Sequence, residues 1–574
     1  MPQLIPLPKI RRFVAQDLKI SRWEDVQPYF EQLLAQEVST LPALQSWLQQ
    51  RSELESVLDE DLAWRYIRMT CDTANEAHRQ AYEFFIGEIF PQMAPYDDQL
   101  NRQLLGSAAI DQMTEPAFLL YKRRVEGAIR LYRAENIPLQ AEQKQLESAY
   151  GALIGSMSIT HEGAELTLPQ AAQLLKAPDR VLRQHIWQQI SDRRQQDQAQ
   201  LDELFSKLIA LRHQIAVNAG FESYTAYRFV ELGRFDYSEQ DCLNFHDTIR
   251  ALVVPLKAQF DADRAQALGL PSLRPWDTKA EPADKPALKP FSDEADLIEK
   301  SIAAFAQIDP YFGDCLYSMQ QMGHFDLSSR KGKAPGGYNY PLMESGAPFI
   351  FMNAAGSMED LETMMHEGGH AVHSFLTKDL QLSAYKALPS ETAELASMSM
   401  ELMSMTQYPL FFATEAEQKR ARYEQIQRAV TVLPWIAAID AFQHWIYAHP
   451  HHTVPERVQQ WAQLFMAYGS PEVDWSGLED RLPLQWQAQL HLFEVPFYYI
   501  EYGFAQLGAL GVWKNFVANP QQAVLQYKTA LALGHTASIP AVYEAAGVKF
   551  DFSKTYLADL LAFVQQQLST LKAS

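Results

Sequence analysis

The residues best suited to chemistry form one short motif, HEGGH, at residues 366–370. His366 and His370 are four residues apart, so on a helix both imidazoles project from one face, about a turn apart. Two imidazole nitrogens at that spacing can both reach a single zinc ion at about 2.0–2.1 Å. Glu367 lies to one side, where its carboxylate can hold a water molecule on the metal. The motif predicts a hydrolytic zinc site, against the alternative of two solvent-facing histidines on a structural helix.

A catalytic zinc also needs a third protein ligand and an open position for water. Downstream, Glu391, Glu394 and Glu401 are separated by three and seven residues and therefore share one side of a second predicted helix. Spacing alone leaves all three open, and a solvated helix face is the usual place of a glutamate. His373 follows His366 by seven residues and also faces the metal side. It could orient a ligand, contact substrate or ligate the metal itself.

A second chemical cluster is a tyrosine-rich segment that follows His491. Pro496 can open a helix there, because proline fits the first turn. Tyr498, Tyr499 and Tyr502 then project from one side of that helix, at spacings of three and four residues. A tyrosine stays protonated near neutral pH and can donate a hydrogen bond to a developing oxyanion. Taken alone, the segment favours the alternative of an aromatic helix face packed in the core.

The elements that must position these groups are also visible in the sequence. Ser357 can cap the helix of the HEGGH motif, with Glu359 and Asp360 favourably placed in its first turn. Gly368 and Gly369 each weaken that helix by roughly 1 kcal/mol relative to alanine. A helix that keeps both glycines should have another element packed closely against it.

The sequence of the rest of the chain predicts helices with few interruptions. Residues 22–265 carry apolar positions at helical spacing, with one hairpin candidate at 156–168. Residues 270–291 contain five prolines and predict a surface connection. Glycines, prolines and aromatics at 325–356 predict a small sheet, with a short strand at 348–352.

Composition narrows the function classes. The chain has 574 residues, 47% of them hydrophobic and 21% charged, which excludes disorder, collagen and coiled coil as overall descriptions. Its net charge is 49 − 70 = −21, so we expect neither nucleic acid nor a membrane surface as a partner. The three cysteines show no paired spacing and predict neither disulfides nor a thiolate zinc site. With no signal-peptide pattern and no apolar run of about 18 residues, we expect a cytoplasmic protein.

Together, these segments resemble the thimet oligopeptidase and oligoendopeptidase F family of zinc metallopeptidases, in its bacterial oligoendopeptidase F branch. The resemblance covers most of the chain from about residue 200 to 565. The matching segments are RPWD (274–277), RKGKAPGGY (330–338), PFIFMN (348–353), LETMMHEGGHAVHS (361–374), LPSETAELASMSMEL (388–402) and HLFEVPFYYIEYG (491–503).

The resemblance assigns roles that spacing leaves open. The family's third zinc ligand falls on Glu394. Its substrate-binding histidine falls on His491, and its tyrosine pair matches Tyr499 and Tyr502, with Tyr498 still a candidate. Tyr502 is the first choice for the oxyanion donor and Tyr499 the second, with Glu367 as general base. The remaining substrate-binding candidates are Gly336, Gly337 and His373.

The resemblance also implies a fold and an activity. We expect a mainly α, two-lobed ellipsoid with a deep substrate channel and a small β-sheet beside the zinc-binding helix. Residues 1–195 would form an N-terminal helical lobe and residues 196–574 the catalytic region. One zinc ion per chain would support hydrolysis of internal bonds in short unfolded peptides, with the strand at 348–352 pairing with substrate. A peptidyl-dipeptidase and a non-catalytic peptide-binding scaffold are the alternatives, and the oligomeric state stays open.

Overall fold

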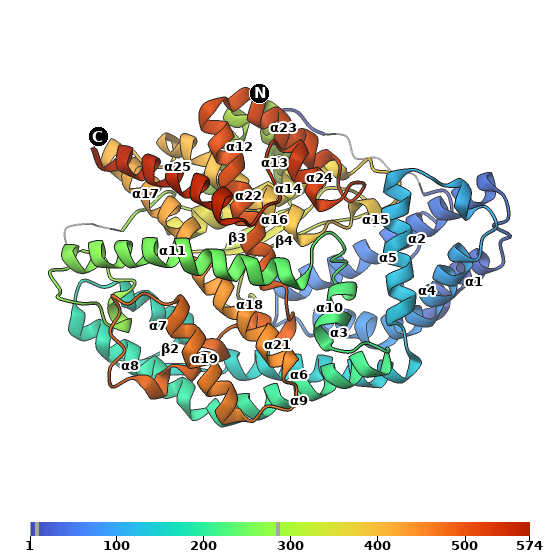
Figure 1. Cartoon of the computed structure of the whole chain (residues 1–574). Coiled ribbons are helices and arrows are strands. Elements are labelled where there is room, and N and C mark those ends of the chain that lie inside the picture. The colour runs from blue at the N-terminus through green and yellow to red at the C-terminus, as the bar shows by residue number, and fades with distance from the viewer. Residues whose placement is uncertain (1, 6–10, 283–286, 574) are drawn as a thin grey trace.

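Helices make up most of the computed structural model, which describes residues 2–5, 11–282 and 287–573 (Figure 1). The mainly α prediction is confirmed. The N-terminal helices are α1 (Gln27–Leu34), α2 (Leu41–Cys71), α3 (Glu76–Phe84), α4 (Phe90–Leu105), α5 (Pro116–Leu131) and α6 (Ile137–Gly155). The middle helices are α7 (Leu168–Gln173), α8 (Arg180–Gln196), α9 (Gln198–Asn218), α10 (Tyr224–Glu231), α11 (Glu239–Ala267), α12 (Glu294–Ile308) and α13 (Pro310–Met322).

The C-terminal half returns to helix directly after a small sheet, as its sequence predicts. Its helices are α14 (Met358–Thr377), α15 (Ser383–Lys386), α16 (Ser390–Ser404), α17 (Glu415–Thr431), α18 (Leu433–Ala448), α19 (Val454–Tyr468), α20 (Pro483–Gln487), α21 (Leu490–Glu494), α22 (Tyr499–Ala518), α23 (Pro520–Ala532), α24 (Ile539–Ala545) and α25 (Lys554–Ala573).

Strands occur in two places. β1 (Ser158–His161) and β2 (Ala164–Thr167) form an antiparallel hairpin, where the sequence predicts one. The second sheet has the order β3 (Phe325–Ser328), β5 (Phe349–Ala354), β4 (Tyr338–Tyr340), with β3 parallel and β4 antiparallel to β5. The prediction that the strand at 348–352 pairs with substrate is therefore wrong, because β5 is the central strand and both of its edges are occupied. The edge strand beside α14 is β4.

Among the described residues, the buried core has one large cluster and three smaller ones. The large cluster runs from Tyr150 to Leu568 and surrounds the helices that carry the HEGGH motif and the tyrosine segment. A second cluster joins residues between Val14 and Val125 to Leu382 and Tyr385. The division of the chain between residues 195 and 196 stays a prediction.

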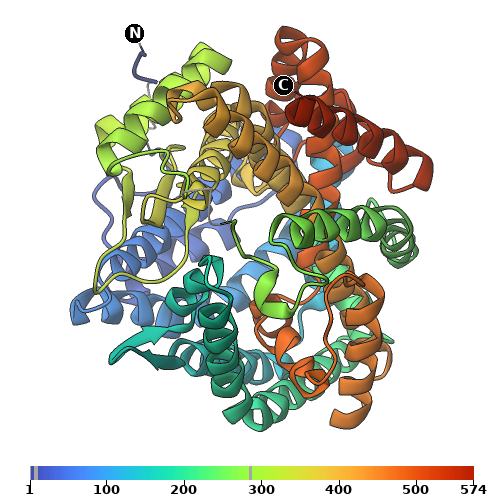
Figure 2. The same cartoon turned by 90° about the vertical axis from the view of Figure 1, so that its left-hand side faces the viewer.

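The views show how the chain is arranged. In Figure 1, α1–α5 form one end of the molecule and α6–α9 run along its lower edge. Figure 2, turned by 90°, keeps the teal helices α8 and α9 at the bottom and the red C-terminal helices at the top. The long helix α11 crosses between these two layers.

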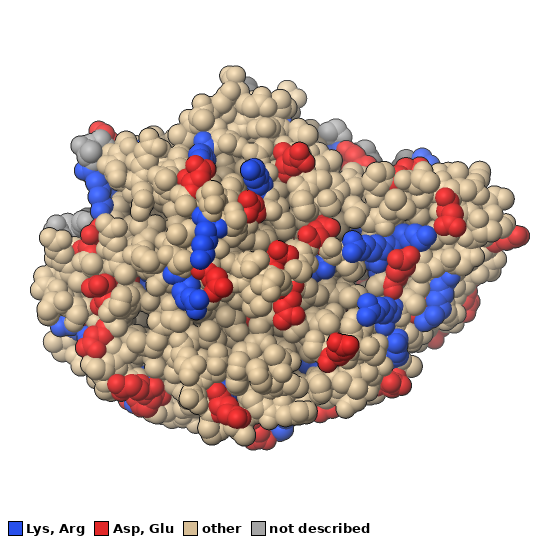
Figure 3. All heavy atoms as spheres, in the orientation of Figure 1, with Lys and Arg blue, Asp and Glu red and all other residues tan. Residues whose placement is uncertain are grey.

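The surface in Figure 3 carries acidic and basic side chains interspersed among neutral ones. No helix in the described part of the chain combines the length and the apolar character needed to cross a membrane.

Candidate metal centre

The HEGGH motif lies in the middle of α14, whose start is fixed by a capping box. The Ser357 hydroxyl accepts a hydrogen bond from the Asp360 N–H at 3.2 Å, and the Asp360 carboxylate accepts one from the Ser357 N–H at 2.8 Å. From the small sheet, the side-chain amide of Asn339 on β4 donates a hydrogen bond to the backbone carbonyl of Glu367 at 3.1 Å. The cap and the sheet together fix the register of the metal-binding face.

The two glycines of the motif mark close helix contacts, as the sequence predicts. A Cβ on Gly369 would lie 2.7 Å from the Ser397 Cα and 2.9 Å from the Ala396 carbonyl oxygen, both in the backbone of α16. A Cβ on Gly368 would lie 2.4 Å from the ring of Phe305 on α12. The absence of a side chain at Gly369 lets α16 approach α14 closely enough to bring its carboxylates to the histidines.

Three side chains of α14 and α16 converge on one point. The Glu394 Oε2 lies 3.3 Å from the His366 Nε2 and 3.6 Å from the His370 Nε2. Ligands at about 2.0–2.1 Å in a tetrahedral zinc site are about 3.3–3.4 Å apart, so this spacing fits one shared ion. Two imidazoles and a carboxylate are one of the donor sets that catalytic zinc sites use.

The structure shows which of the three candidate glutamates can act as the third metal ligand. Glu391 points away from the histidines, and its Oε1 accepts a hydrogen bond from the Tyr237 hydroxyl at 2.6 Å. Glu401 contacts the other nitrogen of His366, Nδ1, at 2.7 Å. Only Glu394 faces the Nε2 atoms of both histidines.

The supporting residues hold the ligands in orientation. Because Glu401 binds the Nδ1–H of His366, the Nε2 lone pair is left for a metal. Gln425 donates to the Glu401 Oε2 at 2.9 Å, and the Ser397 hydroxyl donates to the Glu394 Oε2 at 3.0 Å. Gln425, Ser397 and Asn339 were missed by the sequence analysis, because nothing in their spacing links them to the motif.

Burial and charge set the protonation of the site. Burial lowers the pKa of His370 to about 4, which keeps a neutral ring with a free lone pair. Burial opposes ionisation of Glu394, but its contacts with the His370 and His366 imidazoles and the hydrogen bond from the Ser397 hydroxyl hold its pKa at about 2. Burial raises the pKa of Glu367 to about 7, which suits a group that both accepts and returns a proton near neutral pH.

A cavity of about 750 Å³ opens onto the three ligands. Its walls come from distant parts of the chain: α5, the end of α10, β4, α14, the start of α16 and the segment before α22. His366, Glu367, His370 and Glu394 all line it. A volume of this size holds a short extended peptide but no folded protein.

The tyrosine segment also reaches this cavity, but only in part. Tyr498 and Tyr502 line it, whereas Tyr499 and His491 are not among the described lining residues. The Tyr499 hydroxyl lies instead beside Trp435 and Gln489. His491 lies behind the two lining tyrosines, with its ring centroid 5.9 Å from that of Tyr502.

The local backbone explains why only some of the tyrosines reach the cavity. The helix begins at Tyr499 rather than at Pro496, because Phe497 adopts a left-handed backbone with φ of 66°. The Phe497 N–H is held by the Gln443 side chain and its carbonyl by Arg234. The turn at Pro496–Tyr498 directs Tyr498 into the cavity.

Two further substrate-binding predictions differ from the structure. His373 is 1% exposed and lies outside the described cavity lining, because it faces the core toward the Leu531 backbone. Gly336 is exposed outside the cavity, and its carbonyl accepts a hydrogen bond from the Asn353 amide at 2.9 Å. Gly337 does line the cavity, at the start of β4.

The chain matches two family models. The model described as peptidase family M3 matches residues 173–561, which include every ligand above, and the peptidase M3 N-terminal domain matches residues 13–131. This chain belongs to peptidase family M3.

Curated relatives of this M3 chain share low identity with it. It is 24% identical over 261 residues to the chromosomal oligoendopeptidase F of Lactococcus lactis subsp. cremoris, covering 43% of this chain and 41% of the relative. It is 27% identical over 190 residues to oligopeptidase PepF of Bacillus subtilis strain 168, covering 32% and 27%. The matched part thus spans less than half the length of these relatives.

Solved structures match over nearly the whole length. PZ peptidase A, solved with an inhibitor, superposes with a TM-score of 0.90 at 26% identity, covering 97% of this chain and 99% of that one. Oligoendopeptidase-F from Enterococcus faecium has a TM-score of 0.64 at 16% identity, covering 96% and 97%, and shows the fold alone.

The close approach at Gly369 gives a direct test of how this M3 site is assembled. Gly369→Ala should destabilise the fold by about 1–3 kcal/mol and weaken metal binding, because its Cβ can be placed only by separating α14 from α16. Gly151→Ala, inside α6 with only an ordinary 3.7 Å contact, is the matched control and should be neutral or slightly stabilising. Thermal melts and zinc titration measure both. Unchanged affinity in Gly369→Ala would show that the helix contact does not position Glu394.

Proposed function

We propose that this M3 chain is a zinc-dependent oligopeptidase that hydrolyses internal bonds of short unfolded peptides. The observation that carries the proposal is the convergence of His366, His370 and Glu394 beside Glu367 on the floor of one cavity. The names of the relatives, oligoendopeptidase F and oligopeptidase PepF, support the same activity.

Each group has a defined task in this proposal. His366, His370 and Glu394 would hold zinc, which when bound polarises a carbonyl and makes water more acidic. The Glu367 carboxylate accepts the proton of the attacking water and later delivers it to the leaving amine nitrogen. The Tyr502 hydroxyl, or that of Tyr498, donates a hydrogen bond to the oxygen that gains negative charge.

Substrate would bind along the edge of the small sheet. Among the described strands, β4 pairs with β5 alone, and its residues Tyr338 and Asn339 line the cavity together with the preceding Gly337. An extended peptide could add to that open edge through backbone hydrogen bonds, which do not depend on the side chains of the peptide. Binding of this kind suits a peptidase with broad sequence tolerance.

The metal ligands can be tested without an activity assay. His366→Ala and His370→Ala should each lose one equivalent of zinc, because two protein ligands cannot hold the ion as three do. His535→Ala is the matched control: it also lines the cavity, but its Nδ1 bonds to the Ala387 carbonyl at 2.8 Å. Elemental analysis of the purified proteins gives the count. Full zinc content in both ligand variants would contradict the assignment.

A peptidyl-dipeptidase remains the second candidate, and one observation favours it. Three cationic side chains line the cavity, Arg124, Lys378 and Lys386. Arg124 donates to the Ala384 carbonyl at 2.6 Å through Nη2, and its buried Nε has no partner among the described residues. A guanidinium so placed could hold the terminal carboxylate of a peptide.

Matched peptides distinguish these functions. An endopeptidase should cleave a peptide acid and the corresponding amide at similar kcat/KM, whereas a dipeptidase should lose at least about tenfold on the amide, because it loses an ion pair. Mass spectrometry of the products locates the cut. A non-catalytic scaffold would cleave neither, with or without a chelator. The peptide substrates, the expected absence of nucleic-acid and membrane partners, and the cytoplasmic location stay predictions.

A further inference from the structure

A second cluster of possible metal ligands lies away from the cavity, where α11 packs against α18. Each helix contributes two side chains four residues apart, Cys242 and His246 from α11 and Asp440 and His444 from α18. The ligand atoms of Cys242, Asp440 and His444 all lie within 4.8 Å of one another. Cys242 and Asp440 are 0% exposed and His444 is 6% exposed.

Two atoms in this cluster lack the partners that burial demands. The Asp440 Oδ1 and the His444 Nε2 are buried and make no hydrogen bond within the described chain. The His444 Nε2 lies 3.2 Å from the Asp440 Oδ2, yet the two do not meet hydrogen-bond geometry. Buried polar atoms without partners cost about 1–3 kcal/mol each, so native structures rarely keep them empty.

The surrounding bonds direct both groups toward a common centre. The His444 Nδ1 contacts the Glu239 Oε1 at 3.1 Å, which leaves the Nε2 lone pair facing the Asp440 carboxylate. His246 Nε2 bonds the Asp440 Oδ2 at 2.8 Å and leaves Oδ1 available. The catalytic ligand His366 has the same arrangement, with Glu401 on Nδ1 and a ligand carboxylate 3.3 Å from Nε2.

From this geometry we infer that the chain binds a second divalent cation of the zinc class, held by the Cys242 Sγ, the Asp440 Oδ1 and the His444 Nε2. Thiolate, imidazole and carboxylate are all zinc donors. Cys242 gives up its thiol proton to solvent on binding, so one thiolate and one carboxylate balance the charge of the ion. Glu239 and His246 orient the ligands. The competing explanation is a protonated His444 between Glu239 and Asp440 with no metal.

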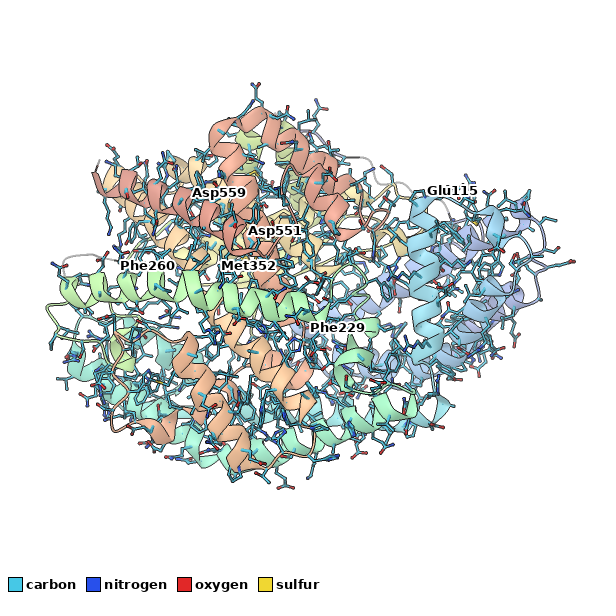
Figure 4. All side chains as sticks on the ribbon, in the orientation of Figure 1. Glu115, Phe229, Phe260, Met352, Asp551 and Asp559 are labelled. Atoms are coloured by element: carbon cyan, nitrogen blue, oxygen red, sulfur yellow. The ribbon has the colours of Figure 1, made fainter. Side chains whose placement is uncertain are left out.

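The position of this cluster gives the ion a structural role. The His444 ring packs edge-on against Phe497 at 5.1 Å and against Phe229 at 6.5 Å. Phe229, labelled in Figure 4, belongs to α10. Phe497 is the residue with left-handed backbone directly before Tyr498. A metal at His444 would therefore brace the strained turn that presents the tyrosines, at no point touching substrate.

Cobalt substitution provides the decisive measurement. The intact chain is produced with Co²⁺ in place of Zn²⁺, because a fully buried site must fill as the protein folds. We expect two Co²⁺ per chain and a thiolate-to-cobalt absorption band in the near ultraviolet, which the histidine and carboxylate ligands of the catalytic site cannot give. One Co²⁺ per chain and no such band in the wild-type protein would overturn the inference, whatever the variants do.

Variants assign the band to its ligand. Cys242→Ala should lose the band and one equivalent of metal, whereas Cys315→Ala, an equally buried cysteine on α13, should keep both. His366→Ala should lose only the catalytic equivalent and keep the band, so failure of the catalytic assignment and failure of this one are distinguishable. A Cys242→Ala protein that folds and retains two metals would refute the site. If Cys242→Ala does not fold, the wild-type spectrum and metal count decide.

Discussion

Glu367→Gln is expected to keep its metal and to lower kcat by about 10²–10⁴-fold, because an amide of similar size cannot accept the proton of the attacking water. The side chain is almost fully buried and lines the cavity next to the three ligands. Burial raises the pKa of Glu367 to about 7, so the wild-type group can exchange protons at little cost near neutral pH. Steady-state kinetics with a quenched peptide and elemental analysis on the same preparation measure both properties.

The control for this variant is Glu362→Gln on the same helix. Glu362 is also buried, but its carboxylate pairs with Arg428 away from the cavity, and burial raises its pKa to about 8. A glutamine of similar size can still accept a hydrogen bond from the Arg428 guanidinium, so near-normal turnover is expected. A Glu367→Gln protein that binds zinc and cleaves at the wild-type rate would exclude Glu367 as the base.

Tyr502→Phe is expected to lower kcat by about 10²–10³-fold, or about 3–4 kcal/mol, with little change in KM. The hydroxyl lines the cavity, and burial together with the charge of Glu394 raises the pKa of Tyr502 far above its usual value. It therefore stays protonated and can donate a hydrogen bond in the transition state. The phenylalanine ring preserves the packing, so the melting temperature should barely change.

Two neighbouring tyrosines serve as controls of different kinds. Tyr499→Phe should turn over peptide at close to the wild-type rate but lose some stability, because its hydroxyl lies beside Trp435 and Gln489 and outside the described cavity lining. Tyr498→Phe tests whether the second lining hydroxyl shares the role. If Tyr499→Phe shows the large kcat loss and Tyr502→Phe does not, the oxyanion donor assignment must be reversed.

The parts of the site that follow local rules were predictable from sequence. The capped helix of the HEGGH motif depends on spacings within twenty residues, and so does the hairpin near residue 160. The two glycines correctly predicted that another element packs closely against α14, but they did not identify that element as α16. Helical periodicity is local, which is why the mainly α fold could also be predicted.

The parts that depend on distant contacts could not be predicted in this way. Glu391, Glu394 and Glu401 share one helix side, and only the packing of α14 on α16 gives each a different partner. The left-handed backbone of Phe497 depends on Gln443 and Arg234, which are remote in sequence. Strand order has the same origin, since nothing near residue 350 indicates that β5 is flanked on both sides.

The described lining of the cavity comes from distant parts of the chain, from Arg124 on α5 to His535 after α23. During synthesis, the ribosome releases the metal helix well before the tyrosines that complete the pocket. A growing chain therefore has no finished site with which to cut itself or its neighbours on the polysome. Proteolytic competence would therefore require the segment around Tyr502 to be synthesised and packed against α16.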